Sequence, residues 1–142
     1  MAILRGGQLI QLGTPNEVYD APADPFVYDF LGAACRLPGA VAGSRLTVAD
    51  WETTAPKGAP QGPVEVFFRP AEVVFAPLDG AGLGCEVKAI VARGPDARIE
   101  CLIEGRIFEL EARGPGIPNG VAPGLAVRVK PLKPKVYPAQ VA

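Results

Sequence analysis

Two arginines flank a turn-like segment and are the residues of this sequence best placed for ligand chemistry. Arg93 and Arg98 enclose Gly94-Pro95-Asp96-Ala97, whose glycine and proline are typical of a turn between two strands. Backbone N–H groups exposed by such a turn, together with two guanidinium groups, can hold a small oxyanion. The predicted oxyanion site consists of Arg93, Gly94 and Arg98. The alternative interpretation is that they are ordinary solvated turn residues.

Histidine is absent from the 142 residues, and serine occurs only as Ser44. A chain without imidazole has no Ser-His-Asp triad, no Cys-His pair and no histidine-ligated metal. The three cysteines, Cys35, Cys85 and Cys101, are widely spaced and form no Cys-x-x-Cys motif. They are interpreted as buried, reduced thiols in a cytoplasmic setting, and no metal site is predicted.

Acidic pairs and phosphate-binding motifs add no catalytic candidate. Glu109 and Glu111, like Glu100 and Glu104, have the spacing expected for the solvated face of an amphipathic strand. The sequence contains no G-x-x-x-x-G-K-[ST] loop, so we expect no nucleotide cofactor in this chain. The 14 basic and 15 acidic residues, with 7% aromatics, argue against a nucleic-acid partner. An enzymatic activity of the chain itself is not expected.

The elements that would position these residues are short strands. The 17 glycines and 16 prolines disfavour long helices and are tolerated by strands joined through turns. From about residue 35 onward, strand-like runs cover 40–48, 64–68, 72–75, 85–91, 99–104, 106–112 and 125–130. The predicted fold class is therefore all-β, with a small β-barrel as the architecture.

Alternation along these runs predicts which side chains are buried. In 64–68, Val64, Val66 and Phe68 share the inner face and Phe67 points to the other side. In 85–91 the expected inner face consists of Cys85, Val87, Ala89 and Val91.

Residues 1–32 have a different character. Two strand-like runs surround Gly6-Gly7 and predict a tight hairpin. Thr14 and Glu17 have capping-box spacing for a helix over 15–20, and Asp24-Pro25 begins a second helix that ends at Gly32. The expected apolar face of this second helix consists of Phe26, Val27, Phe30 and Leu31. A hairpin and two short helices cannot enclose a core alone, so this segment must pack on something else.

Several of these motifs resemble a known family. Residues 5–19, RGGQLIQLGTPNEVY, with Phe26–Gly32 after them, resemble the end of the ATPase domain of importer-type ABC transporters. Arg69-Pro70 and Glu72 lie in a strand similar to the R-P-E strand of the TOBE domain, an oligomer-binding-like regulatory domain. Ala71, the extra residue in that motif, is similar to the sulfate/thiosulfate branch of these ATPases. Residues 1–32 would then be a remnant of the nucleotide-binding domain, and 33–142 a TOBE-like regulatory β-barrel.

The resemblance implies a regulatory and dimerisation domain in the ATP-binding subunit of a sulfate, thiosulfate or molybdate importer. The implied partners are its own ATPase domain, a second copy of the subunit and the membrane permease subunits. The implied location is cytoplasmic, at the inner face of the membrane. Walker A, Walker B, the signature motif and the switch histidine have no counterpart here. ATP and Mg²⁺ would therefore belong to the parent protein, of which this chain is expected to be a fragment.

The sequence also offers candidates for a dimer contact and an alternative function. If the domain dimerises, an exposed apolar strand face should form the contact, and Phe67 and Phe75 are the candidates. Arg69, Pro70 and Glu72 are expected to have a structural role. The alternative function is a stand-alone cytoplasmic barrel that binds molybdate or sulfate through Arg93 and Arg98. That alternative leaves residues 1–32 unexplained.

Overall fold

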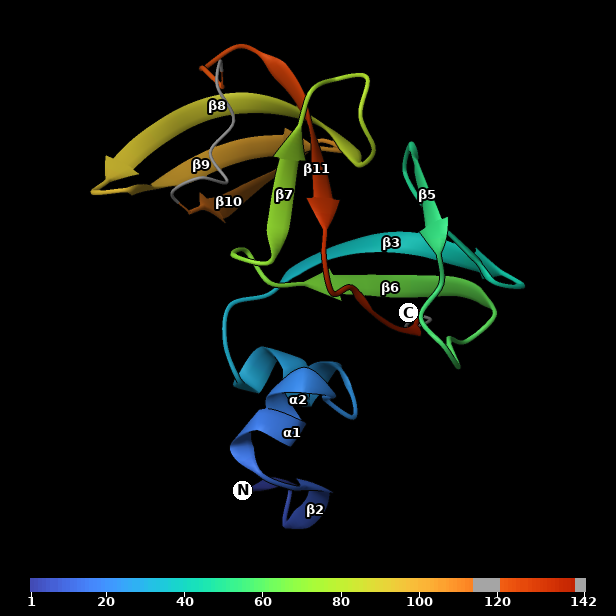
Figure 1. Cartoon of the computed structure of the whole chain (residues 1–142). Coiled ribbons are helices and arrows are strands. Elements are labelled where there is room, and N and C mark those ends of the chain that lie inside the picture. Colours follow the sequence, from blue (N-terminus) through green and yellow to red (C-terminus); the bar gives the residue numbers. More distant parts are fainter. Residues whose placement is uncertain (114–120, 140–142) are drawn as a thin grey trace. The chain divides into compact units, whose positions relative to one another are not determined.

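The computed structural model describes residues 1–113 and 121–139 (Figure 1). Its contacts divide the chain into two units, Met1–Ala34 and Cys35–Ala142, and each unit is described by itself. No helix in the described ranges is long and apolar enough to cross a membrane.

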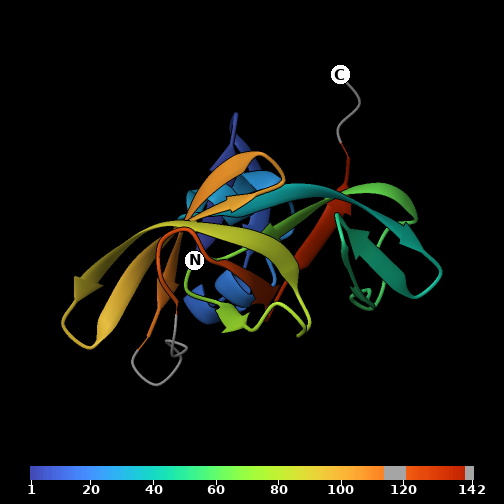
Figure 2. The ribbon, with the colours of Figure 1, turned by 90° about the horizontal axis from the view of Figure 1, so that it is seen from above.

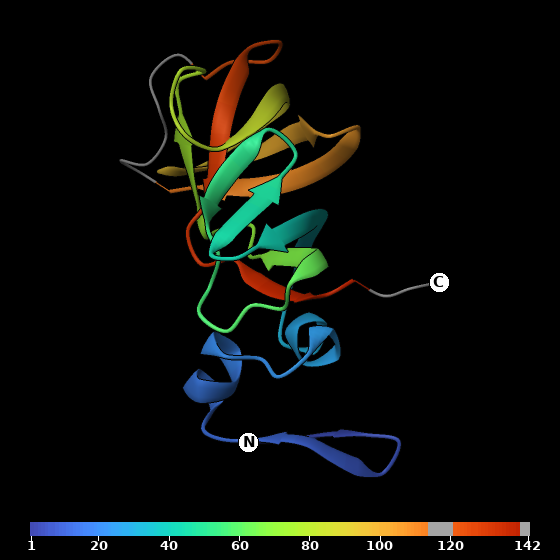
Figure 3. The ribbon, with the colours of Figure 1, turned by 90° about the vertical axis from the view of Figure 1, so that its right-hand side faces the viewer.

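The first unit contains the hairpin and the two helices expected from the sequence. Strands β1 (Ala2–Arg5) and β2 (Gln8–Leu12) pair antiparallel. They are joined by Gly6 and Gly7, whose positive φ angles of 57° and 79° suit a tight hairpin turn. Helices α1 (Pro15–Asp20) and α2 (Pro25–Phe30) lie together on one face of this hairpin (Figure 3).

Side-chain caps determine where both helices begin. The Glu17 N–H donates to Thr14 Oγ1 at 3.2 Å, and the Thr14 N–H donates to Glu17 Oε2 at 3.2 Å, which completes the predicted capping box. Asp24 Oδ1 accepts a hydrogen bond from the Val27 N–H at 2.9 Å. Because each cap lies within four residues of its partner, sequence spacing alone was sufficient to predict it.

The core of the first unit is small. It consists of Ile3, Val18 and Val27, with Ile10, Phe26 and Leu31 packed against it. The predicted apolar face of the second helix is wrong at Phe30, which is 66% exposed. Its ring stacks on Phe26 with a centroid distance of 6.2 Å, outside the buried cluster. A cluster of three buried side chains encloses too little space to cover a further phenylalanine.

The described part of the second unit forms two antiparallel five-stranded sheets. In the first sheet the strand order is β10 (Arg106–Ala112), β9 (Asp96–Ile103), β8 (Leu83–Arg93), β11 (Ala126–Pro131) and β7 (Val73–Ala76). In the second sheet it is β12 (Lys135–Pro138), β6 (Gly62–Phe68), β3 (Cys35–Ala42), β4 (Arg45–Val48) and β5 (Trp51–Thr54). Hairpins β8–β9 and β4–β5 lie at opposite ends of the unit (Figure 2).

The all-β class is confirmed, but the expected closed barrel is not present among the described strands. The first sheet curls until β10 reaches the segment before β7, where the Glu111 N–H donates to the Pro70 carbonyl at 3.0 Å. This contact is a single hydrogen bond and not a strand ladder. Strand β7 has only four residues, and the preceding Pro70 lacks an N–H to extend the pairing.

Both sheets contribute to one hydrophobic core. Val64, Val66 and Phe68 of β6 are each 1% exposed and belong to it, as alternation predicted. In β8 the predicted inner face fails after Val87, because a β-bulge lies between Val87 and Ala89. The extra residue, Lys88, shifts the alternation by one position. Ile90 consequently packs against the core, while Val91 is 53% exposed.

A polar cluster of Asp50, Gly84 and Arg128, called the clasp below, joins the two sheets at the β4–β5 turn. Asp50 forms an ion pair with Arg128 of β11 and accepts the Gly84 N–H of β8 at 3.2 Å. Arg128 Nε donates to the Leu78 carbonyl at 2.9 Å. A Cβ added to Gly84 would lie 3.0 Å from Asp50 Oδ2, so glycine makes this approach possible. Partial burial raises the pKa of Asp50, but the hydrogen bonds from Arg128 and Gly84 outweigh it and lower the pKa overall.

The clasp gives the first prediction. Asp50→Asn is expected to lower the free energy of unfolding at pH 7 by about 0.5–1 kcal/mol, since Asp50 is half exposed and the pair is screened by water. Because the folded pKa is lowered, the contribution of Asp50 is present at neutral pH and is lost as the pH falls through that pKa. Urea unfolding of both proteins at several pH values measures the difference.

Glu52→Gln is the matched control. Glu52 pairs with Arg45 at 3.8 Å, and both side chains are more than 60% exposed, so its removal should change stability by less than about 0.5 kcal/mol. Equal stability of wild type and Asp50→Asn at pH 7 would contradict the stabilising role of the clasp.

Candidate functional site

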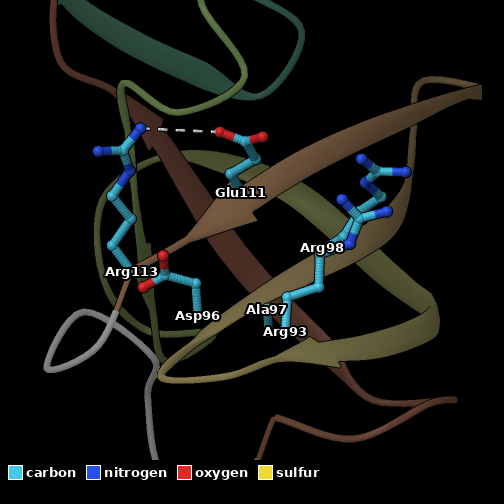
Figure 4. Close-up of a pocket in the computed structure, with 6 residues that line it drawn as sticks. All are labelled: Arg93, Asp96, Ala97, Arg98, Glu111 and Arg113. Carbon is cyan, nitrogen blue, oxygen red and sulfur yellow. Dashed lines mark ion pairs between the residues drawn. The ribbon is translucent and has the colours of Figure 1, made fainter.

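A surface pocket of about 170 Å³ lies where hairpin β8–β9 meets strand β10 (Figure 4). Six residues line it: Arg93, Asp96, Ala97, Arg98, Glu111 and Arg113. The pocket includes both arginines of the predicted oxyanion site. Gly94 is not among the lining residues. It lies in the turn that joins the strands, with a positive φ of 59°.

Strand pairing brings the lining side chains together. Arg93 is opposite Asp96 across the β8–β9 ladder, and Arg98 is opposite Glu111 across the β9–β10 ladder. Ile99 and Cys101 of β9 are fully buried, so the alternate positions of this strand face outward. The charged residues therefore share the outer face of the sheet because the core takes the inner one.

Carboxylates accompany the arginines in this pocket. Arg98 lies 3.8 Å from Glu109, and Arg113 lies 4.0 Å from Glu111. No ion pair of Arg93 is found among the described residues. The lining contains three arginines against Asp96 and Glu111, which leaves one net positive charge.

Sequence reasoning missed Glu111 and Arg113 as members of the pocket. A usable signal was present, because the hairpin turns at Glu104-Gly105 and its symmetry places residue 111 opposite residue 98. Within the described residues, no group of three or more Cys, Asp or Glu side chains is arranged to hold a metal ion.

The R-P-E-like segment connects the two sheets. Arg69 is 5% exposed, and its carbonyl accepts the Glu72 N–H at 3.0 Å in a tight turn between β6 and β7. The Glu72 carbonyl accepts the Leu132 N–H at 2.9 Å, and its side chain lies 3.7 Å from Lys133. With the Pro70 carbonyl bound by Glu111, the segment contacts β10 and the β11–β12 connection.

The three thiols are buried and unbridged. Burial raises the pKa of Cys35 to about 12. A hydrogen bond with Cys85, together with burial, raises the pKa of Cys101 as well. The same hydrogen bond lowers the pKa of Cys85. Neutral buried thiols such as Cys35 and Cys101 pack as small apolar side chains.

Comparison with known proteins identifies relatives over nearly the whole chain. The sulfate/thiosulfate import ATP-binding protein CysA 1 of Chromobacterium violaceum is 36% identical over 98% of this chain and 40% of its own length. CysA of Xanthomonas campestris is 34% identical with the same coverage. The chain is homologous to the C-terminal part of the ATP-binding subunits of ABC importers. It spans about 40% of the length of these two relatives.

Further comparisons identify an iron-importer subunit as a relative and a solved structure with a similar fold. The Fe(3+) ions import ATP-binding protein FbpC of Streptomyces coelicolor is 38% identical over 74% of this chain and 30% of its own length. No protein-family model matches the chain. Among solved structures, the cytoplasmic molybdate-binding protein ModG with molybdate bound superposes with a TM-score of 0.52. At 13% identity, over 74% of this chain and 96% of that one, the similarity shows the oligomer-binding-like fold alone.

Phe67 and Phe75, the residues expected to form a dimer contact, are not part of an exposed apolar face. Phe67 is fully buried and Phe75 is 6% exposed. Phe67 packs edge-on against Tyr137 with a centroid distance of 5.5 Å, and Arg36 Cζ lies 5.0 Å from the ring centroid. Arg36 belongs to β3 and Tyr137 to β12, the two strands that flank β6 in the sheet. Phe75 lies in the common core opposite Val129.

This burial gives the second prediction. Phe67→Ala is expected to lower the free energy of unfolding by about 3 kcal/mol or more, because it empties a buried site. Phe30→Ala is the matched control and should cost less than about 0.5 kcal/mol, since Phe30 is 66% exposed. Urea unfolding compares the two. Equal losses, or dissociation of a dimer by Phe67→Ala at unchanged stability, would restore Phe67 as a surface contact.

Proposed function

We propose that this chain is the regulatory and dimerisation domain of the ATP-binding subunit of a sulfate-type ABC importer, preceded by the end of the ATPase domain. The observation that carries the proposal is the similarity over 98% of the chain to two sulfate/thiosulfate import ATP-binding proteins. The iron importer relative matches a shorter part, 74% of the chain. Sulfate or thiosulfate is therefore the transported anion that the comparisons favour.

The first unit supports this proposal because it leaves an apolar face bare. Both helices lie on one face of hairpin β1–β2 (Figure 3). Leu4, Leu9 and Leu12 of the hairpin are 61%, 57% and 71% exposed. Leu4 and Leu9 are opposite each other across the ladder. We assign the ATPase domain of the parent protein as the cover of this face, since the relatives are longer than this chain and match it with their C-terminal part.

In this proposal the chain controls the ATPase and performs no chemistry itself. ATP and Mg²⁺ would be bound by the ATPase domain, whose Walker motifs have no counterpart in this sequence. A second copy of the subunit and the membrane permease subunits are the partners, which places the protein in the cytoplasm at the inner membrane face. Regulation would act by shifting the equilibrium between open and closed dimers.

The stand-alone oxyanion-binding function is not favoured by the pocket. A divalent inorganic anion bound by Arg93 and Arg98 would share the pocket with the carboxylates of Asp96 and Glu111. The negative charges of the anion and of the two carboxylates repel each other, which opposes binding unless they are screened or neutralised. The fold shared with the molybdate-binding protein does not transfer its ligand.

A chimera tests the proposed function. The part of the Chromobacterium violaceum protein that precedes the matched region is joined to this chain and expressed in a strain that lacks the native subunit. Sulfate uptake is expected to recover to within about tenfold of the native level, because the bare hairpin face completes the ATPase domain. Uptake of radiolabelled sulfate, ATP hydrolysis and sedimentation of the purified chimera are the measurements.

Two leucine variants of the chimera provide the matched comparison. Leu9→Asp places a charge on the bare face and should reduce uptake at least tenfold. Leu132→Asp, at a similarly exposed leucine of the second unit, should change uptake less than twofold. A chimera that folds and hydrolyses ATP but imports no sulfate would refute the importer role. Equal effects of the two variants would remove the assigned cover of the hairpin.

A further inference from the structure

We propose that the pocket between hairpin β8–β9 and strand β10 binds a small zwitterion of the free α-amino acid class. Its cationic end would bind the ligand carboxylate, and its anionic end the ligand ammonium group. Six residues form the pocket, and five of them carry a formal charge.

The charges of the pocket are separated in space. In the view of Figure 4, the guanidinium groups of Arg93 and Arg98 gather at one end, and the carboxylates of Asp96 and Glu111 lie toward the other. Arg113 pairs with Glu111 at the anionic end. Ala97 is the single apolar residue of the lining, and it is 7% exposed because its side chain packs in the core. A ligand that spans the distance between the two charged ends would meet opposite charges at its two ends.

The cationic end can accept a carboxylate. Two guanidinium groups repel each other, and a bound anion relieves that repulsion. Arg98 shares its charge with Glu109 at 3.8 Å, whereas Arg93 has no ion pair among the described residues. Guanidinium forks bind planar carboxylates through paired N–H groups. Arg93 is thus the residue on which ligand binding should depend most.

The volume suits a molecule of few atoms. A pocket of about 170 Å³ corresponds to the space of about six liquid waters at roughly 30 Å³ each. L-Alanine has six non-hydrogen atoms and carries both charges. The exposure of the lining side chains, 36% for Arg98 and 72% for Arg113, implies weak binding with rapid exchange.

Three probes separate the contributions of the two charges. The ¹⁵N-labelled 142-residue chain is titrated with L-alanine, propionate or ethylamine, the last two each lacking one charge of alanine. NMR follows the Nε–H signals of Arg93 and Arg98. L-Alanine is expected to bind at least tenfold more tightly than propionate or ethylamine. Sodium sulfate is titrated in parallel, because tighter binding of sulfate than of alanine would make the pocket an oxyanion site and overturn the inference.

Charge-removing variants give effects of opposite sign. Arg93→Gln should weaken alanine binding at least tenfold, whereas Arg106→Gln, at an exposed arginine outside the pocket, should change it less than twofold. Glu111→Gln should weaken alanine binding but strengthen propionate binding, because it removes the ammonium partner and also a repulsive charge. Asp96→Asn provides a second test with the same expected signs. Unchanged spectra at saturating alanine, or equal effects of Glu111→Gln on both ligands, would refute the zwitterion site.

This inference goes beyond the proposed function and its test is independent of it. The titration is measured on the chain itself, without ATP hydrolysis or transport. A failed chimera with intact alanine binding would reject the importer role alone, and the reverse result would reject the pocket alone.

Discussion

The burial of one apolar core between two antiparallel sheets is the constraint on which the second unit depends. Each strand presents alternate residues to that core, so the remaining positions are forced to the outside. In β9 the buried Ala97, Ile99 and Cys101 leave Asp96 and Arg98 on the outer face. The charged pocket is therefore a consequence of core packing. Its residues come together because three strands, β8, β9 and β10, place their outer positions in register.

The first unit is organised by a different balance. Its helices have six residues each and begin at side-chain caps, while its core contains three fully buried side chains. Short isolated helices are marginal in water, and a two-stranded hairpin adds little. Local hydrogen bonds thus specify the shape of this unit, but burial within it is too limited to explain its stability. An apolar partner on the leucine-bearing face of the hairpin resolves that imbalance, and the ATPase domain proposed above has the required place in the chain.

The regulatory role proposed above requires a domain that is rigid enough to transmit a change and that offers a surface able to sense one. The shared core, the Asp50–Arg128 clasp and the buried turn at Arg69 connect the two sheets in this way. The charged side chains of the pocket at the end of hairpin β8–β9 lie on the outer face of the sheet, so a ligand could bind them without disturbing the core packing. Binding energy at such a site would act through differential affinity for two dimer states.

The sequence by itself determined the features that depend on neighbours in the chain. These are the glycine turns, the capping box, the helix starts, the all-β class and the resemblance to importer subunits. Tertiary structure decided what depends on distant partners. The bulge at Lys88 reversed the faces of β8, strands β3 and β12 covered Phe67, and the short β7 left the barrel open. Alternation specifies two faces of a strand, but only the strand order and register determine what lies against each face.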